Sequence, residues 1–400
     1  RALAYTRMDD DQKAYDLIEK YQDAFSADYQ NNVNSDQAFE DISHIEKTLK
    51  TEQLGINLIR QKSDCQTKGD ICHLDLKFYN LENSLDLSAL FPIIENMGFY
   101  VTAEIPSKVR LPNGDIVWVQ HFVLKTNGVV LKDGDFQNRK HLFERCFLAV
   151  QRGAIEDDTL NQLTLKEGVS GRDILILRTV LRYLRQTIYT YSKTFTEQVV
   201  THNSKIARLL IESFHASHNP TFKGSRKSAH QRIDAELKHE FDNIKSIDHD
   251  NIMRLFKNII DATLRTNFYQ TAFDGSIKDY VSIKLDSAQI TSLPDPRPYR
   301  EIFVYAPETE GVHLRGDAIA RGGLRWSDRH EDFRTEVLGL MKAQMVKNAV
   351  IVPMGSKGGF VVKNPPTTGG RDAWIAEGIR CYKTFIRGLL DITDNVIDNK

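Results

Sequence analysis

RGDAIARGGLRWSDRHEDFRTEVLGLMKAQMVKNAVIVPMGSKGGFVVK, residues 315–363, is the stretch that decides the fold of the C-terminal part of this chain. It carries nine Lys or Arg against five Asp or Glu, whereas the whole chain has a formal net charge of -1. Each of its two glycine pairs follows a cation directly: Arg321 precedes Gly322-Gly323, and Lys357 precedes Gly358-Gly359. Fixed cations beside backbone without side chains suit a small anionic substrate, which can approach closely.

A helix followed by a glycine-rich loop is predicted inside this stretch. Five residues at intervals of four, three, four and three share one helical face: Phe333, Val337, Leu340, Gln344 and Lys347. We expect the helix to begin near Asp328, a buried strand at 349–352, and a turn at 353–356. Lys357 then stands at the tip of a loop formed by Gly355, Ser356, Gly358 and Gly359, before a return strand at 360–362. Lys347 in the last helical turn could equally be a partner of the helix dipole.

Nucleotide-binding loops do not fit this pattern. A phosphate-binding P-loop needs Ser or Thr directly after its lysine, and Gly358 follows Lys357. A GxGxxG dinucleotide fingerprint is missing from the whole sequence. We therefore expect no cofactor-binding residues in this chain.

The part before this stretch predicts a multi-domain α+β and α/β architecture. Strands at 73–79, 99–105 and 116–124, with a helix at 89–97, suggest a small ferredoxin-like module. This module is either a packing domain or an amino-acid-sensing regulatory module, and its sequence carries no ligand signature. The expected order is a helical segment at 1–60, the α+β module at 70–126, a helical domain at 130–272, and an α/β domain at 276–400.

Composition excludes several classes of partner. The first sixty residues hold twelve Asp or Glu against seven Lys or Arg, which makes them a poor nucleic-acid arm. No apolar run approaches the roughly 20 residues of a membrane span, and no signal peptide begins the chain. The four cysteines favour a reducing, cytoplasmic location. Cys65 and Cys72 are too widely spaced for paired zinc ligands, so we expect no metal site.

Long segments of the sequence resemble the large bacterial NAD-specific glutamate dehydrogenases. GVHLRGDAIARGGLRWSDRHEDFRTEVLGLMKAQMVKNAVIVPMGSKGGFVVK is similar to their signature, and LDLSALFPIIENMGFYVTAEIP resembles their ACT-like regulatory region. GRDILILRTVLRYLRQT resembles their helical segment. The resemblance implies that residues 276–400 are the substrate-binding part of a glutamate-dehydrogenase-like fold. Because the chain starts at Arg1 rather than Met, we expect a piece of a longer protein, with the cofactor domain beyond Lys400.

The resemblance also assigns roles. It makes Lys357 the catalytic lysine, and it makes Arg321, Gly322, Gly323, Gln344 and Lys347 substrate-binding residues. Arg321 stands where the family has lysine, and an arginine can hold a carboxylate at two points. A lysine that assists water must be partly uncharged, and neighbouring cations and burial favour the uncharged form.

The implied activity is NAD-dependent oxidative deamination of L-glutamate to 2-oxoglutarate and ammonia, in a homo-oligomeric enzyme. The part present here would be inactive alone. The alternative is a non-catalytic amino-acid-sensing or assembly module of a larger protein. Convergence of Arg321, Lys347 and Lys357 within one cleft would favour the enzyme.

Overall fold

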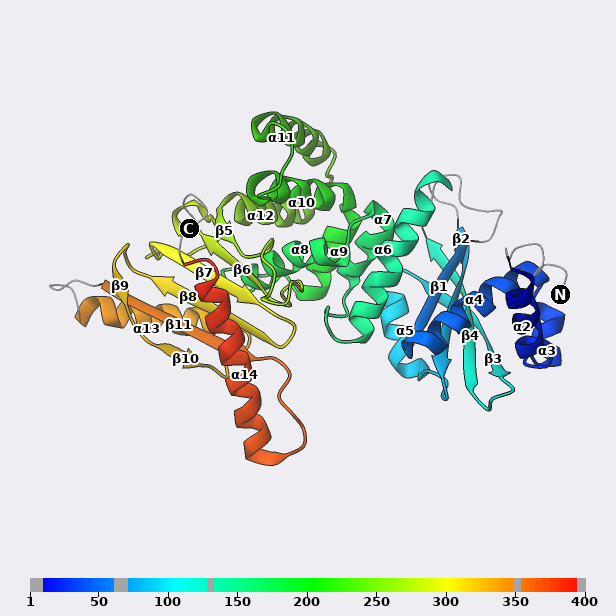
Figure 1. Cartoon of the computed structure of the whole chain (residues 1–400). Helices are drawn as coiled ribbons and strands as arrows, with labels where there is room; N and C mark the ends of the chain where they lie inside the picture. Colours follow the sequence, from blue (N-terminus) through cyan, green and yellow to red (C-terminus); the bar gives the residue numbers. More distant parts are fainter. Residues whose placement is uncertain (1–9, 61–70, 128–132, 348–353, 394–400) are drawn as a thin grey trace. The chain divides into compact units, whose positions relative to one another are not determined.

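The computed structural model describes residues 10–60, 71–127, 133–347 and 354–393, which form two compact units (Figure 1). The first unit takes in residues 1–152 and 157–170, and the second takes in residues 153–156 and 171–400. Within the described ranges, no helix is long and apolar enough to cross a membrane. The same ranges contain no cluster of three or more His, Cys, Asp or Glu that could hold a metal ion. Cys65, one of the two cysteines considered for zinc, lies outside the described residues.

A four-stranded antiparallel sheet forms the centre of the first unit. Its strands are β1 (Gly55–Arg60), β2 (Ile71–Leu81), β3 (Tyr100–Arg110) and β4 (Ile116–Asn127), in the order β1-β2-β4-β3. Helix α5 (Leu87–Asn96) connects β2 to β3, and β4 lies between these two strands, antiparallel to both. The predicted strands and helix of this module are confirmed. Asp86 caps α5, and Gly98 after the helix has a left-handed φ of +93°, which favours glycine.

The first strand of this sheet was missed. Residues 55–60 form β1, so the expected helical segment at 1–60 is wrong at its end. The sequence GINLIR is too short for its pattern to distinguish a strand from a helical turn. Pairing with β2 decides the outcome.

Three helices precede this sheet: α2 (Asp11–Tyr21), α3 (Ala27–Asn32) and α4 (Ser35–Thr51). A buried polar cluster joins α3 and α4 to the sheet. The carboxylate of Asp41 on α4 accepts from Lys77 Nζ on β2 at 2.7 Å and from the Tyr79 hydroxyl at 2.6 Å. The Tyr29 hydroxyl of α3 donates to it at 2.5 Å. The buried charges are therefore paired and hydrogen-bonded, as burial requires.

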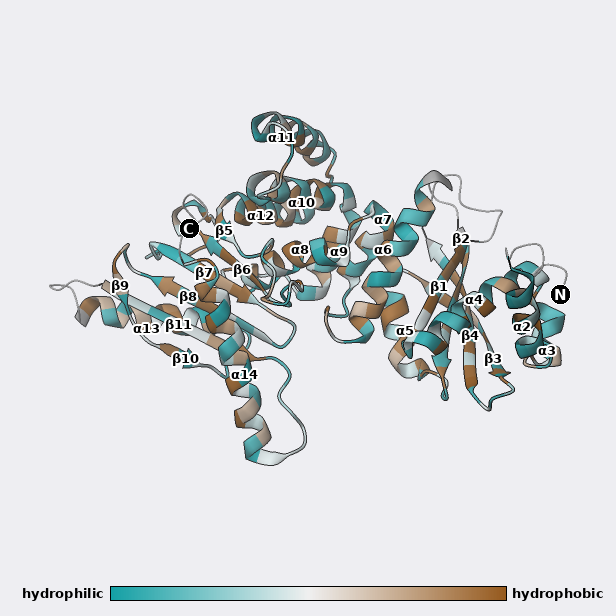
Figure 2. Ribbon diagram, viewed as in Figure 1, coloured by the Kyte–Doolittle hydropathy of each residue, from teal (hydrophilic) through white to brown (hydrophobic). Residues whose placement is uncertain are grey.

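The helices that follow divide between the two units. The first unit contains α6 (Asp133–Gln151), a 3-10 turn η1 (Thr159–Gln162) and α7 (Leu163–Glu167). The second contains α8 (Gly171–Leu184), α9 (Lys193–His202), α10 (Ser204–His218), α11 (Arg226–Asp242) and α12 (Ile247–Asp261). The predicted helical domain at 130–272 is therefore not one unit. Helix α8 is buried on nearly all sides and packs on strands of the second unit, which is the physical reason that it belongs to that unit. Helix α11, in the same unit, is largely hydrophilic (Figure 2).

A seven-stranded sheet organises the second unit. Its strands are β5 (Thr263–Thr266), β6 (Val281–Leu285), β7 (Arg300–Tyr305), β8 (Thr309–Arg315), β9 (Ala320–Arg321), β10 (Leu324–Trp326) and β11 (Met354–Val362), with a 3-10 turn η2 (Ser287–Gln289) after β6. The order is β10-β11-β8-β7-β6-β5, and β9 also pairs with β11. Because β5 pairs with β6, the sheet reaches back past the boundary expected near residue 275.

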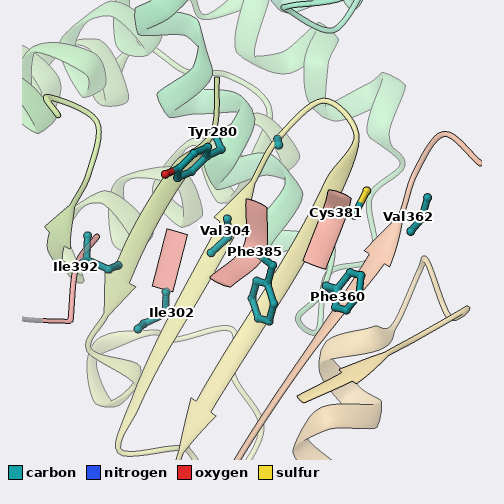
Figure 3. Close-up of a cluster of buried hydrophobic side chains, with 9 residues drawn as sticks. Tyr280, Ile302, Val304, Phe360, Val362, Cys381, Phe385 and Ile392 are labelled. Carbon is teal, nitrogen blue, oxygen red and sulfur yellow. The ribbon is translucent and has the colours of Figure 1, made fainter. Parts of the chain in front are cut away.

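Two helices cover opposite faces of β11. Helix α14 (Gly370–Leu390) presses Cys381 and Phe385 into a cluster with Phe360, Val304 and their neighbours (Figure 3). Helix α13 (Phe333–Lys347) lies on the other face. Side chains alternate along a strand, so the odd-numbered residues of β11, Lys357 among them, face α13. Helix α13 begins at Phe333, five residues later than predicted.

Candidate functional site

Lys357 lies inside strand β11 and not at the tip of a loop. Its backbone is opposite Leu314 of β8, and the next residue, Gly358, is opposite Leu324 of β10. Gly355, Ser356, Gly358 and Gly359 belong to the same strand, so the predicted glycine-rich loop is wrong. The glycines were interpreted as turn formers, but here they serve close packing of the strand. The strand predicted at 349–352 lies outside the described residues. The turn predicted at 353–356 is wrong from residue 354 on, because Met354 to Ser356 belong to β11.

The two glycines that share the face of Lys357 allow α13 to approach closely. A methyl group added at Gly355 would lie 3.2 Å from Cβ of Gln344. A methyl group added at Gly359 would lie 2.6 Å from Cγ2 of Val337. Gly355 and Gly359, two residues before and two after Lys357, therefore have no side chain at the points where the helix packs on the strand. Lys357 is the half-buried side chain held between these two contacts.

The Arg321-Gly322-Gly323 segment lies against the strand that carries Lys357. Arg321 pairs with Gly355 at the end of β9, and its side chain is exposed. A methyl group added at Gly322 would lie 1.5 Å from the carbonyl oxygen of Ser356. A methyl group added at Gly323 would lie 4.0 Å from Nζ of Lys357. Both glycine pairs singled out in the sequence thus meet in one place, beside the ammonium group.

Gln344 joins this group from α13. Its Nε2 donates to the backbone carbonyl of Arg321 at 3.1 Å. Its Oε1 is buried and has no hydrogen-bond partner among the described residues, and it lies 3.1 Å from where a methyl group on Gly322 would be. An unmet buried acceptor is costly, so a donor supplied by a ligand would be favourable there. Lys347 is the last residue of α13, and its side chain lies outside the described residues.

The arginines that follow the first glycine pair are held by carboxylates. Arg325 Nε donates to Glu336 at 2.8 Å, and Arg329 forms an exposed ion pair with Asp332. Arg334 is buried and forms two hydrogen bonds with Glu301 of β7, at 2.8 and 2.5 Å.

Sequence reasoning missed Ser327 and Glu336 as a pair. Ser327 Oγ donates to Glu336 Oε2 at 2.5 Å, and Ser327 is 3% exposed. Their separation of nine residues spans the end of a strand, a turn and the first turn of a helix. No helical or strand period brings such positions together, so the sequence carried no local signal for the contact.

Comparison with known families follows the same segments. Models of glutamate dehydrogenase match as helical motif 2 at residues 2–48, the ACT3 domain at 53–138, and helical motif 3 at 155–220. The model described as bacterial NAD-glutamate dehydrogenase, catalytic domain, matches residues 236–400, which include every residue of the site described above. The chain belongs to the bacterial NAD-glutamate dehydrogenase family. The predicted ACT-like module and the dehydrogenase-like C-terminal part agree with these matches.

Two relatives show how much of such a protein is present. The NAD-specific glutamate dehydrogenase of Halomonas elongata is 38% identical over 95% of this chain. The NAD-specific glutamate dehydrogenase of Mycobacterium tuberculosis is 40% identical over 94% of it. The chain spans 23% of the length of each of these relatives.

Proposed function

We propose that this chain supplies the glutamate-binding half of a NAD-dependent glutamate dehydrogenase, which converts L-glutamate to 2-oxoglutarate and ammonia. The observation that carries the proposal is the position of Lys357. Its Nζ stands beside Gly323, on the strand face that α13 covers, with the unpartnered Oε1 of Gln344 at the neighbouring Gly322. A cation, an acceptor and bare backbone in one place suit an α-amino acid, which has a carboxylate to pair and an ammonium to donate.

The roles proposed for the chain's own residues follow from these contacts. Lys357 accepts a proton from the water that adds to the oxidised Cα–N group of the substrate, after which ammonia leaves. Arg321, and Lys347 at the end of α13, pair with the two carboxylates of glutamate. Gln344 orients the substrate nitrogen through its Oε1. Gly322 and Gly323 leave room for the substrate against the strand.

The residues described here do not fit NAD. The sheet of the second unit is mainly antiparallel, and among its described strands none opens a glycine-rich turn into a helix in the manner of a dinucleotide site. The name of the matched family and the names of the relatives are what support NAD as the oxidant of the whole enzyme.

Two finer expectations belong to the same proposal. The inserted β4 between β2 and β3 supports a ferredoxin-like arrangement of the ACT3 region, with β1 as its outer strand. A cytoplasmic, homo-oligomeric enzyme agrees with the composition and with the family resemblance.

Replacing Lys357 by methionine in the intact enzyme tests the catalytic role. Methionine keeps the length of the side chain and removes the base, so turnover at saturating glutamate should fall by about 10²–10⁴-fold. Lys383→Met is the matched control, because Lys383 is an exposed lysine of α14, the helix on the other face of the sheet. Wild-type turnover in Lys357→Met, with the control also active, would exclude Lys357 as the catalytic residue.

A further inference from the structure

Glu336 on α13 holds two residues of the neighbouring segment with its two carboxylate oxygens. Oε1 accepts from Arg325 Nε at 2.8 Å, and Oε2 accepts from Ser327 Oγ at 2.5 Å. The Glu336 side chain is 13% exposed and that of Arg325 is 56% exposed, so the contact with Ser327, which is itself 3% exposed, is the better shielded of the two. Hydrogen bonds to a charged, partly buried acceptor are the strong kind.

The segment held by Glu336 is the one that borders Lys357. Strand β10 pairs with β11 over three residues, beginning with Leu324 opposite Gly358. Gly358 N donates to the Gly323 carbonyl at 3.2 Å, and Ser327 N donates to the Phe360 carbonyl at 2.8 Å. A three-residue parallel pairing at the end of a sheet is weak by itself. Side-chain contacts from α13 therefore have a large share in fixing where this segment lies.

Helix α13 consequently holds both strands of the site with consecutive residues. Val337 packs where Gly359 of β11 has no side chain, and Glu336 binds Arg325 and Ser327 of the β10 segment. The distance between Gly323 and the Lys357 ammonium depends on both contacts. Glu336 can therefore affect the position of the substrate-binding residues without contacting the reacting atoms.

We infer that Glu336 is a positioning residue for glutamate binding. By binding Arg325 and Ser327, it keeps the preceding segment Arg321–Gly323 beside Lys357. Arg325 is then a structural partner of Glu336 and not a ligand of a substrate carboxylate. This inference rests on the function proposed above. It goes beyond that proposal by naming the residue that fixes the distance between Gly323 and the Lys357 ammonium group.

Steady-state kinetics of the intact enzyme separate this role from a general effect on folding. Glu336→Ala should raise the KM for glutamate about tenfold, the size expected for lost hydrogen bonds to a charged group. Its kcat should stay within about threefold, because Lys357 remains on β11. Ser327→Ala, which removes one of the two contacts, should raise KM by a smaller factor. Glu336→Gln keeps an acceptor for Ser327, so its KM for glutamate should lie between those of Glu336→Ala and wild type.

Glu377→Ala is the matched control. Glu377 is also a helical glutamate paired with an arginine, Arg380, but it belongs to α14 on the other face of the sheet. KM and kcat of this variant should remain at wild-type values. Should Glu336→Ala fail to fold, Ser327→Ala and Glu336→Gln decide the question alone.

The outcomes distinguish this inference from the proposed function. Wild-type KM in the folded Glu336 and Ser327 variants, with Lys357→Met inactive, would overturn the positioning role and leave the proposed function intact. A fall in kcat with unchanged KM would also overturn it. Full turnover in Lys357→Met would instead remove the proposed function itself.

Discussion

Replacing Arg334 by methionine should destabilise the second unit by about 3–5 kcal/mol, because it leaves a carboxylate buried without a cation. Arg334 is 1% exposed and Glu301 is fully buried. The guanidinium binds both oxygens of Glu301, and the Tyr183 hydroxyl of α8 adds a third hydrogen bond at 3.0 Å. After the replacement, the Tyr183 hydroxyl is the side-chain donor to that carboxylate that remains among the described residues.

The structure supplies a control from the same segment. Arg329 forms an ion pair with Asp332 in which the side chains are 46% and 47% exposed. Water screens such a pair, so Arg329→Met should cost less than about 1 kcal/mol. Removing both buried partners, in Arg334→Met with Glu301→Leu, should recover most of the lost stability, since no charge is then left buried.

Hydrogen exchange of the amides of β7 and α13, measured by mass spectrometry in the intact protein, reports on this unit alone. Arg334→Met should lower the opening free energy of both elements, and Arg329→Met should leave it near wild type. Equal protection in the two variants would refute the reasoning. So would a double variant less protected than Arg334→Met, because relief of the uncompensated charge is the predicted cause of recovery.

Two further predictions concern the neighbourhood of Lys357. Gly322→Ala places a methyl group 1.5 Å from the Ser356 carbonyl oxygen, so glutamate turnover should fall at least tenfold by the usual cost of overpacking; Gly339→Ala, where the added methyl group meets nothing within 4 Å, should not change it. Burial and the nearby charge of Arg315 lower the pKa of His313 from 6.5 to about 4. Stability from neutral His313 is therefore complete above pH 6.5 and lost as the pH falls towards 4, and urea midpoints at pH 7 and 4.5 should differ less in His313→Phe than in wild type.

Much of the local structure was accessible from the sequence. The strands predicted at 73–79 and 116–124 and the helix predicted at 89–97 are present as β2, β4 and α5. The spacing from Phe333 to Gln344 predicted α13, with Phe333 and Val337 buried as expected. Such features depend on neighbours within a few residues, so a local pattern is enough to reveal them.

Tertiary contacts decided what the glycines around Lys357 do. Glycines on both sides of a lysine are equally typical of a turn and of a strand packed against a helix. The close approach of Val337 and Gln344 to Gly359 and Gly355 selects the strand. The roles assigned to Lys357, Arg321 and Gln344 stay predictions, although Lys357 and Gln344 lie beside the two glycines that follow Arg321.

The sequence by itself was enough to recognise the family, because long segments resemble its members, and enough to locate most helices and strands, because local patterns carry them. The pairing of Arg334 with Glu301, of Glu336 with Ser327, and the division of the helices between two units came from tertiary structure alone. The partners in these contacts are separated by up to 33 residues. Their meeting depends on which faces pack together to remove apolar surface from water, and no short stretch of sequence encodes that choice.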